Sequence, residues 1–332
     1  MEMTATAAKT TWVLGTEGDV QWRVQNFLGA LWERAGLDGM IVPVYQTESG
    51  LPGPKILWHE RELQDADPFV PLVRMKTSRM VEELAKQKPA LRMAAVLHSC
   101  EARALAERYR QDDFSLENWL LIGVDCLASF PQADYEWRLE RAGNIRHLTQ
   151  EILRNARQGG ISTDRFRSAC QMCTRPDARD VDLCIGVIGL PLKEFALLIA
   201  RDHYLAEKLG LSQIADQPAP GWLIDQRQRV LGKLAERHEH VKQRIQAELE
   251  NGFPQDVQEW IEHLHMCSDC RACLDACPLY ADQLEAGVEA VAEWLAACVA
   301  CGICDDVCPE QMPLTAIIER IMYSRQSDFL PA

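Results

Sequence analysis

The stretch MAAVLHSCEARALAERY, residues 93–109, decides the class of fold. It begins as a short apolar run typical of a buried strand and continues, after Cys100, as a helix. Four more apolar runs read as strands, and an amphipathic helix is predicted over residues 19–36. The runs are TTWVLG (10–15), GMIVPVY (39–45), WLLIGVD (119–125) and DLCIGVIG (182–189). Alternating strands and helices predict an α/β domain with a mostly parallel sheet.

The composition restricts the classes of function. The 332 residues carry a net charge of −14 and no cluster of Lys and Arg, so a nucleic-acid partner is not expected. No apolar run reaches the ~18 residues of a membrane span, and residues 1–12 lack the features of an export signal. We therefore expect a cytoplasmic protein without a membrane span. Its 13 cysteines favour metal binding over disulfides, because the cytosol keeps thiols reduced.

A proline-rich segment, ADQPAPGW at residues 215–222, separates the α/β region from the rest. The charged residues 225–252 have few apolar positions and predict a solvated spacer helix. His238 and His240 do not share a face of that helix, which argues against a metal role for them. The predicted parts are a domain over 1–214, a linker and charged spacer helix over 215–254, and a small helical domain over 255–332.

Eight cysteines form two copies of the pattern Cys-x2-Cys-x2-Cys-x3-Cys-Pro, within residues 267–278 and 298–309. Three thiolates at this spacing bind one [4Fe–4S] cluster, and the cysteine before the proline usually binds the other cluster. One predicted set is Cys267, Cys270, Cys273 and Cys308, and the other is Cys277, Cys298, Cys301 and Cys304. Zinc is the alternative, but it requires neither the third cysteine nor the Cys-Pro step. The pattern predicts a ferredoxin-like domain that relays single electrons.

Five cysteines remain, all in the α/β region. Cys100 and Cys126 each follow a predicted strand, and α/β sheets bind ligands at the carboxyl ends of their strands. Cys170 and Cys173 form CQMC in an arginine-rich loop, whereas Cys184 lies inside an apolar strand and is predicted to be a core residue. The first four suffice for a third [4Fe–4S] site. Their spacing alone leaves open a packing role, a redox dithiol or half of a zinc site.

The segments around these cysteines resemble a known family. They carry CEARA (100–104), GVDC (123–126) and CQMC (170–173), preceded by DPFVPLVRMKTSRMVEEL (67–84). In this order they resemble the beta subunits of coenzyme F420-reducing hydrogenases and formate dehydrogenases. The formate dehydrogenase type is the most similar, since it also ends in a two-cluster ferredoxin-like segment. The likeness covers roughly residues 12–205 and the paired cysteine region.

The resemblance implies a set of cofactors. Family members bind FAD and one [4Fe–4S] cluster in the α/β domain, and the flavin exchanges a hydride with F420. Matched by motif, the ligands of this third cluster fall on Cys100, Cys126, Cys170 and Cys173. No G-x-G-x-x-G nucleotide fingerprint is present, so FAD rests on the resemblance alone. Arg74, Lys76 and Arg103 are candidate contacts of the flavin phosphates or of an anionic carrier, and no catalytic residue is assigned.

The resemblance also implies a function. We expect an electron-transfer subunit of an oxidoreductase complex that passes electrons between FAD and a series of clusters. The expected partners are a molybdenum or tungsten formate dehydrogenase, a hydrogenase or a heterodisulfide-reductase-like module. Two departures weigh against F420: His98–Ser99 where the family usually has Arg-Pro, and Ala128–Ser129 where it often has Gly-Thr. They leave a second interpretation open, an iron–sulfur wiring and docking subunit with no hydride site of its own.

Overall fold

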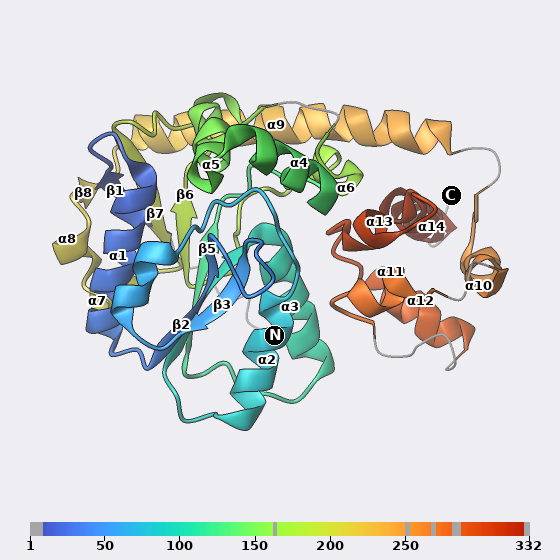
Figure 1. Cartoon of the computed structure of the whole chain (residues 1–332), viewed down its shortest axis with the longest axis horizontal. Coiled ribbons are helices and arrows are strands. Elements are labelled where there is room, and N and C mark those ends of the chain that lie inside the picture. Colours follow the sequence, from blue (N-terminus) through green and yellow to red (C-terminus); the bar gives the residue numbers. More distant parts are fainter. Residues whose placement is uncertain (1–8, 162–164, 250–252, 267–269, 281–286, 329–332) are drawn as a thin grey trace.

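The computed structural model describes residues 9–161, 165–249, 253–266, 270–280 and 287–328. Within these ranges, a mixed sheet of eight strands has the order β3-β2-β4-β5-β6-β7-β1-β8 (Figure 1). The strands are β1 (Thr10–Gly15), β2 (Gly39–Val44), β3 (Gly53–Leu57), β4 (Met93–His98), β5 (Trp119–Val124), β6 (Leu183–Gly186), β7 (Phe195–Ala200) and β8 (Gln217–Pro218). All five runs predicted as strands form strands, and β3, β7 and β8 add to them.

The prediction of a mostly parallel sheet is wrong. Among the described strands, β2–β4, β4–β5 and β5–β6 are parallel, whereas the other four neighbouring pairs are antiparallel. The reason lies in the connections, because a parallel pair needs a long crossover, usually a helix. Only short loops, residues 45–52 and 187–194, join β2 to β3 and β6 to β7. The α/β class was therefore predicted correctly, and the strand directions toward the edges were not.

Helices cover both faces of the sheet. One face packs against α1 (Val20–Ala35), α4 (Gln132–Ala142) and α5 (Ile145–Arg154), and the other against α2 (Thr77–Gln87) and α3 (Ser99–Gln111). In β4, Ala94 and Val96 belong to the first core, and Met93, Ala95 and Leu97 to the second. Alternate residues of a strand point to opposite faces, so a strand covered on both sides is apolar throughout. Shorter elements are the 3-10 helices Glu60–Asp65 and Ala156–Gln158, with α6 (Ser168–Gln171), α7 (His203–Lys208) and α8 (Leu211–Ile214).

The long helix α9 (Gly221–Glu248) is not a solvated spacer over its first half, contrary to the prediction. Leu223, Leu231 and Leu234 are buried in the cores of the α/β region. Arg227, on the same helix face, forms a buried ion pair with Asp125. Residues 217–218 of the predicted linker form the edge strand β8, which pairs with β1. The linker and the start of the spacer are thus packed against the α/β region, while the predicted domain limits stay predictions.

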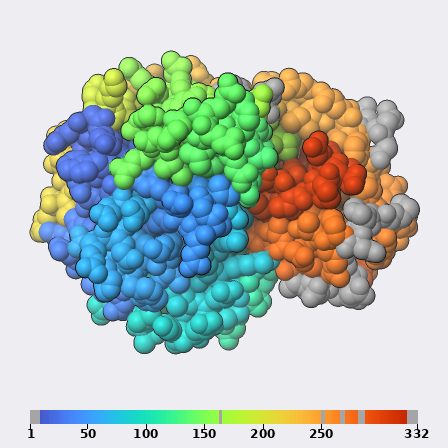
Figure 2. Space-filling view, in the orientation of Figure 1, coloured from blue at the N-terminus to red at the C-terminus, as the bar shows by residue number. Residues whose placement is uncertain are grey.

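The C-terminal segment consists of short helices beside one end of the sheet region, orange and red in Figures 1 and 2. The helices are α10 (Val257–Met266), α11 (Ala272–Ala276), α12 (Val288–Ala296), α13 (Ile303–Val307) and α14 (Leu314–Asp328). Their core includes Trp260, Val291 and Ile317, and it continues into Met75 and Ala104 of the α/β region. In the part of the chain that the structure describes, every helix is too short or too polar to cross a membrane.

Candidate functional site

The first cysteine of the α/β region, Cys100, lies in the first turn of α3, directly after β4. The motif residue beside it, Glu101, is buried and fixes this turn. Its carboxylate accepts hydrogen bonds from the His98 backbone N–H at 3.2 Å and from the Thr77 hydroxyl at 2.5 Å. Burial alone would raise the pKa of Glu101, but its contacts with His98 and Thr77 lower it. Glu101 therefore caps the helix as a carboxylate and holds Cys100 at the carboxyl edge of the sheet.

Three residues of the motif Gly-x-Asp-Cys at the end of β5 have separate structural roles. Gly123 has no room for a side chain, because a Cβ there would collide with the Cβ of Ala178. Asp125 is fully buried and accepts hydrogen bonds from the N–H groups of Val187 and Ile188 at 2.7 and 2.8 Å, and from Arg227. These bonds fix the strand end, so that the next residue, Cys126, can face the cavity described below.

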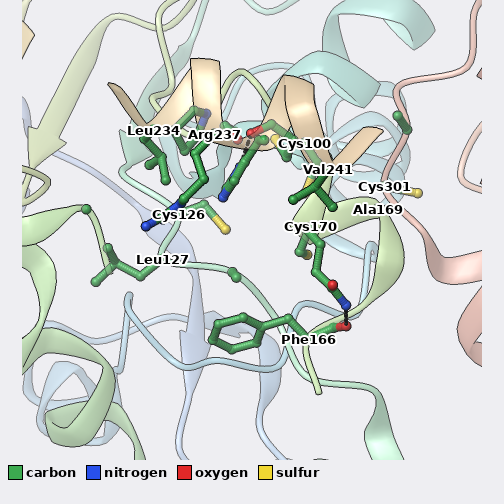
Figure 3. A pocket seen from close by; sticks show the side chains of 18 of the residues that line it. Cys100, Cys126, Leu127, Phe166, Ala169, Cys170, Leu234, Arg237, Val241 and Cys301 are labelled. Carbon is green, nitrogen blue, oxygen red and sulfur yellow. Dashed lines mark hydrogen bonds between the residues drawn. The ribbon is translucent and has the colours of Figure 1, made fainter. Parts of the chain in front are cut away.

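Four thiols come together at this edge of the sheet. Cys100, Cys126, Cys170 and Cys173 line one cavity of about 270 Å³, and Figure 3 shows its wall. The structure thus gathers the four predicted ligands of the third cluster from three separate segments. Cys184 is not on this wall; it is buried and its sulfur lies 4.0 Å from the Asp125 carboxylate.

The environment of these thiols opposes a bare negative charge. Burial, and next the Cys126 thiol, raise the pKa of Cys100 well above its usual value. Burial also raises the pKa of Cys126 and brings that of Cys170 to about 11. Metals bind the thiolate form, so a cationic group in the cavity would offset this cost. The chemistry of the four donors fits a metal centre.

The arrangement of the donors can be compared with the geometry of a cluster. A [4Fe–4S] cube offers a separate iron to each cysteine, so its ligands lie spread around a cavity. Four thiols that line one cavity of about 270 Å³ fit this arrangement.

One face of helix α9 forms part of the cavity wall, and this contact was not predicted from the sequence. Leu234, Arg237, His238 and Val241 lie on the cavity wall. The Nδ1 atom of His238 donates a hydrogen bond of 2.7 Å to the carbonyl oxygen of Cys173, and burial lowers the pKa of this imidazole. The spacing of three and four residues along α9 was the available signal, hidden by the many charges of the helix.

The C-terminal cysteines form a second group. Cys277, Cys298, Cys301 and Cys304, the second predicted set, line one small apolar cavity together with Cys273. Cys277 comes from the first copy of the motif, as the crossing rule expects. Burial raises the pKa values of Cys298 and Cys304 as well.

The other predicted set is only partly described. Cys267 lies outside the described residues, and Cys270 is exposed. Cys273 lines the apolar cavity, whereas Cys308 lines a separate cleft at the end of α13. The described residues therefore do not bring this set around one cavity, and its role as a ligand set stays a prediction.

Backbone strain gathers near these loops. Among the described residues, Ala128, Arg271 and Ala300 have φ angles of 84°, 47° and 51°, and each lies within two positions of a cysteine. Residues with a side chain rarely adopt such angles, and the strain often marks loops that hold a ligand.

The three predicted cofactor contacts do not lie together. Arg74 and Lys76 line a cleft of about 740 Å³ between the α/β region and the C-terminal helices. Phe166 and the ion pair of Arg167 with Asp306, at 2.7 Å, also lie on this cleft. Arg103 lies on the wall of the thiol cavity instead, with its guanidinium bound to backbone carbonyls.

Comparisons with known proteins agree on one group of relatives. No family model matches the chain. The F420-dependent formate dehydrogenase subunit beta of Methanocaldococcus jannaschii is 22% identical over 285 residues, which covers 72% of this chain and 72% of the relative. A chain of the xenon-derivatised F420-reducing [NiFe] hydrogenase complex from Methanosarcina barkeri superimposes with a TM-score of 0.53 at 11% identity. It covers 76% of this chain and 97% of its own length. The first comparison confirms the resemblance of the chain to the beta subunit of an F420-dependent formate dehydrogenase, and the second shows that a chain of an F420-reducing hydrogenase complex shares its fold.

Proposed function

We propose that this chain is an electron-transfer subunit of a multi-subunit oxidoreductase, with FAD and three [4Fe–4S] clusters. The observation that carries the proposal is that four thiols from separate segments line one cavity, beside a second group of cysteines. Its relatives are subunits of F420-linked formate dehydrogenase and hydrogenase complexes. A partner with a formate dehydrogenase, hydrogenase or heterodisulfide-reductase-like active site would complete the reaction.

In this proposal each group of cysteines holds one cluster. The ligands would be Cys100, Cys126, Cys170 and Cys173 for the first; Cys277, Cys298, Cys301 and Cys304 for the second; and Cys267, Cys270, Cys273 and Cys308 for the third. Each cluster would accept one electron at a time. Helix α9 supports the first site, since Leu234 and Val241 give the wall of its cavity an apolar part.

FAD would convert a two-electron hydride into single electrons for the clusters. The cleft lined by Arg74 and Lys76 is the candidate region, because it is large and has these two cations and the aromatic ring of Phe166 on its wall, which also carries carboxylates. There the two cations would hold phosphate groups. Arg103 lies on the other cavity, where two of its five N–H donors bind backbone carbonyls, so its contact with the cofactor stays a separate proposal.

The wiring subunit without a hydride site is the second candidate function. Both departures from the family motif serve local structure here. The His98 ring lies 3.3 Å from the Glu101 carboxylate in the buried turn, and the Ser129 hydroxyl accepts a hydrogen bond of 3.0 Å from the Val73 N–H. Neither side chain is free for a flavin or a carrier, which favours this candidate.

The test is anaerobic purification of the chain with its co-eluting subunits, followed by assays of iron, sulfide and flavin. About twelve irons per chain are expected, four for each cluster. The variant Cys173→Ser should lose up to about four of them, whereas the matched variant Cys184→Ala should keep them all, because Cys184 is a core residue. Loss of iron in Cys184→Ala but not in Cys126→Ala would refute the ligand assignment.

Flavin separates the two candidate functions. Bound FAD with hydride turnover by F420 supports the first, and bound FAD that reacts only with NAD(P)H keeps the flavoprotein and excludes F420. Clusters that pass electrons in a complex whose chain holds no flavin would establish the wiring subunit.

A further inference from the structure

Cys301 belongs to both groups of thiols. It lines the cavity of Cys277, Cys298 and Cys304, and it also lies on the wall of the cavity that contains Cys100 (Figure 3). Cys100 and Cys301 therefore line the same cavity, although they lie about 200 positions apart in the sequence. The described cysteines of the remaining set, Cys270, Cys273 and Cys308, do not reach the Cys100 cavity.

Arg103 links the cavity of Cys100 to the C-terminal cysteine motif. It lies on α3, one turn after Cys100. Its guanidinium donates hydrogen bonds to the carbonyl oxygen of Arg175, two residues after Cys173, at 3.2 Å and to that of Val299 at 3.0 Å. Val299 lies between two cysteines of the C-terminal motif. One side chain therefore joins three segments that carry proposed ligands: the start of α3, the loop after Cys173 and the loop after Cys298.

The backbone beside Cys301 is packed against the backbone beside Cys170. A Cβ on Gly302 would approach the Cβ of Ala169 to 2.5 Å, and Gly302 has a φ of 71°. A few residues further on, the Ser168 hydroxyl donates a hydrogen bond of 2.6 Å to the Asp305 carboxylate. The loop that follows Cys298 is thus fixed directly on the Cys170 loop.

On the basis of the proposed function, we propose that Cys100 and Cys301 form the junction of the electron relay and that Arg103 is its positioning residue. The α/β site then exchanges electrons with the site of Cys277, Cys298, Cys301 and Cys304. The site of Cys270 comes last, on the far side of the junction. Each transfer oxidises one site and reduces the next by one electron, and no bond or proton moves. The exposed Cys270 end is accordingly where electrons leave for, or arrive from, the partner subunit.

The order of the sites is tested by electron paramagnetic resonance on the complex, fully reduced with dithionite under anaerobic conditions. Neighbouring reduced clusters split and broaden each other's signals. The signal of the α/β site is identified as the one that Cys173→Ser removes. Its splitting should survive in Cys270→Ser and disappear in Cys304→Ser, because only the second variant disturbs the site that contains Cys301. Splitting lost in Cys270→Ser and kept in Cys304→Ser would reverse the order, and loss in both or in neither also overturns the proposal.

Arg103 provides a test in which every ligand stays in place. Arg103→Gln should weaken the splitting of the α/β signal without loss of iron, and Arg103→Lys should recover part of it. The matched control is Arg110→Gln on the same helix, since Arg110 is exposed and pairs with Glu107 of its own helix. Unchanged splitting in Arg103→Gln removes the positioning role.

The outcomes also separate this inference from the proposed function. Wild-type protein without three cluster signals would refute the proposed function itself. If wild-type protein has three clusters but the splitting of the α/β signal does not depend on the site of Cys304, only the proposed junction is refuted.

Discussion

Removing Arg227 should destabilise the chain far more than a typical substitution on a helix. The ion pair of Arg227 with Asp125 is buried, with the two side chains 3% and 0% exposed. Burial alone would lower the pKa of Arg227, but the Asp125 carboxylate raises it, so the pair is held in its charged form. The variant Arg227→Met keeps most of the side-chain volume and leaves Asp125 as a buried carboxylate without its cation.

The size of the destabilisation depends on the hydrogen bonds that Asp125 keeps after Arg227 is removed. Asp125 loses the two nitrogen donors of Arg227 and keeps the N–H groups of Val187 and Ile188. Breaking a buried pair by removal of one partner costs about 3–5 kcal/mol. Because two donors still stabilise the carboxylate, we expect the lower end, a loss of about 3 kcal/mol in the free energy of unfolding.

The assay is anaerobic urea unfolding followed by circular dichroism. The matched control is Arg229→Met on the same helix, because Arg229 is exposed and bonds to the Asp225 carbonyl of its own helix at 3.3 Å. This variant should change stability by less than about 0.5 kcal/mol. The double variant Asp125→Ala/Arg227→Met should be less destabilised than the sum of its single variants. A loss no greater than that of Arg229→Met, or strict additivity, would refute the reasoning.

Two further predictions concern buried positions. Burial raises the pKa of Asp67 to about 6, above about 3.9 in the unfolded chain, so the folded state binds this proton more tightly. Its contribution to the free energy of unfolding is therefore complete below about pH 4 and falls by roughly 3 kcal/mol in total as the pH rises through about 6 to about 7. Asp67→Asn should lack this fall in urea titrations across that range, and an unchanged pH slope would contradict the assignment. Gly123→Ala should cost about 1–3 kcal/mol in the same unfolding assay, because the new methyl group would collide with Ala178. Gly232→Ala on α9 is the matched control. A Cβ there would meet no described atom within 4 Å outside the backbone of its own helix, so the change should be neutral or stabilising by up to about 1 kcal/mol. Equal effects of the two substitutions would show that the contact with Ala178 is relieved without cost.

The sequence predicted the parts of the fold that depend on local pattern. Apolar runs identified β1, β2, β4, β5 and β6, because strands buried inside a sheet carry an apolar signal along most of their length. Three strands were missed. The edge strands β8, with only two residues, and β3, with the exposed Lys55, show no continuous apolar run. The interior strand β7 does have one, FALLIA, which was overlooked. Strand direction depends on the length of the connections rather than on the residues within the strands.

The candidate site was likewise predicted where it depends on local sequence pattern and missed where it depends on contacts between distant residues. The cysteines were identified by type and spacing, since few other patterns use them so densely. Arg103 could be recognised as polar but not as the donor to Val299, because that contact joins residues 196 positions apart. The role of His238 was hidden for the same reason: its partner, the carbonyl of Cys173, is set by how α9 crosses the α/β region.

The continuous core beneath the C-terminal helices limits how this protein can be divided or recombined. Val73, Met75, Ala104 and Met172 are all at most 4% exposed, and each is covered by this shared core. A cut near residues 250–254 would expose these apolar side chains on one fragment and leave the other without part of its interior. The cysteine-rich segment is therefore no interchangeable module. A fusion of the C-terminal segment to another protein would also need the surface of the α/β region that covers this core, including Ala169, which faces Gly302.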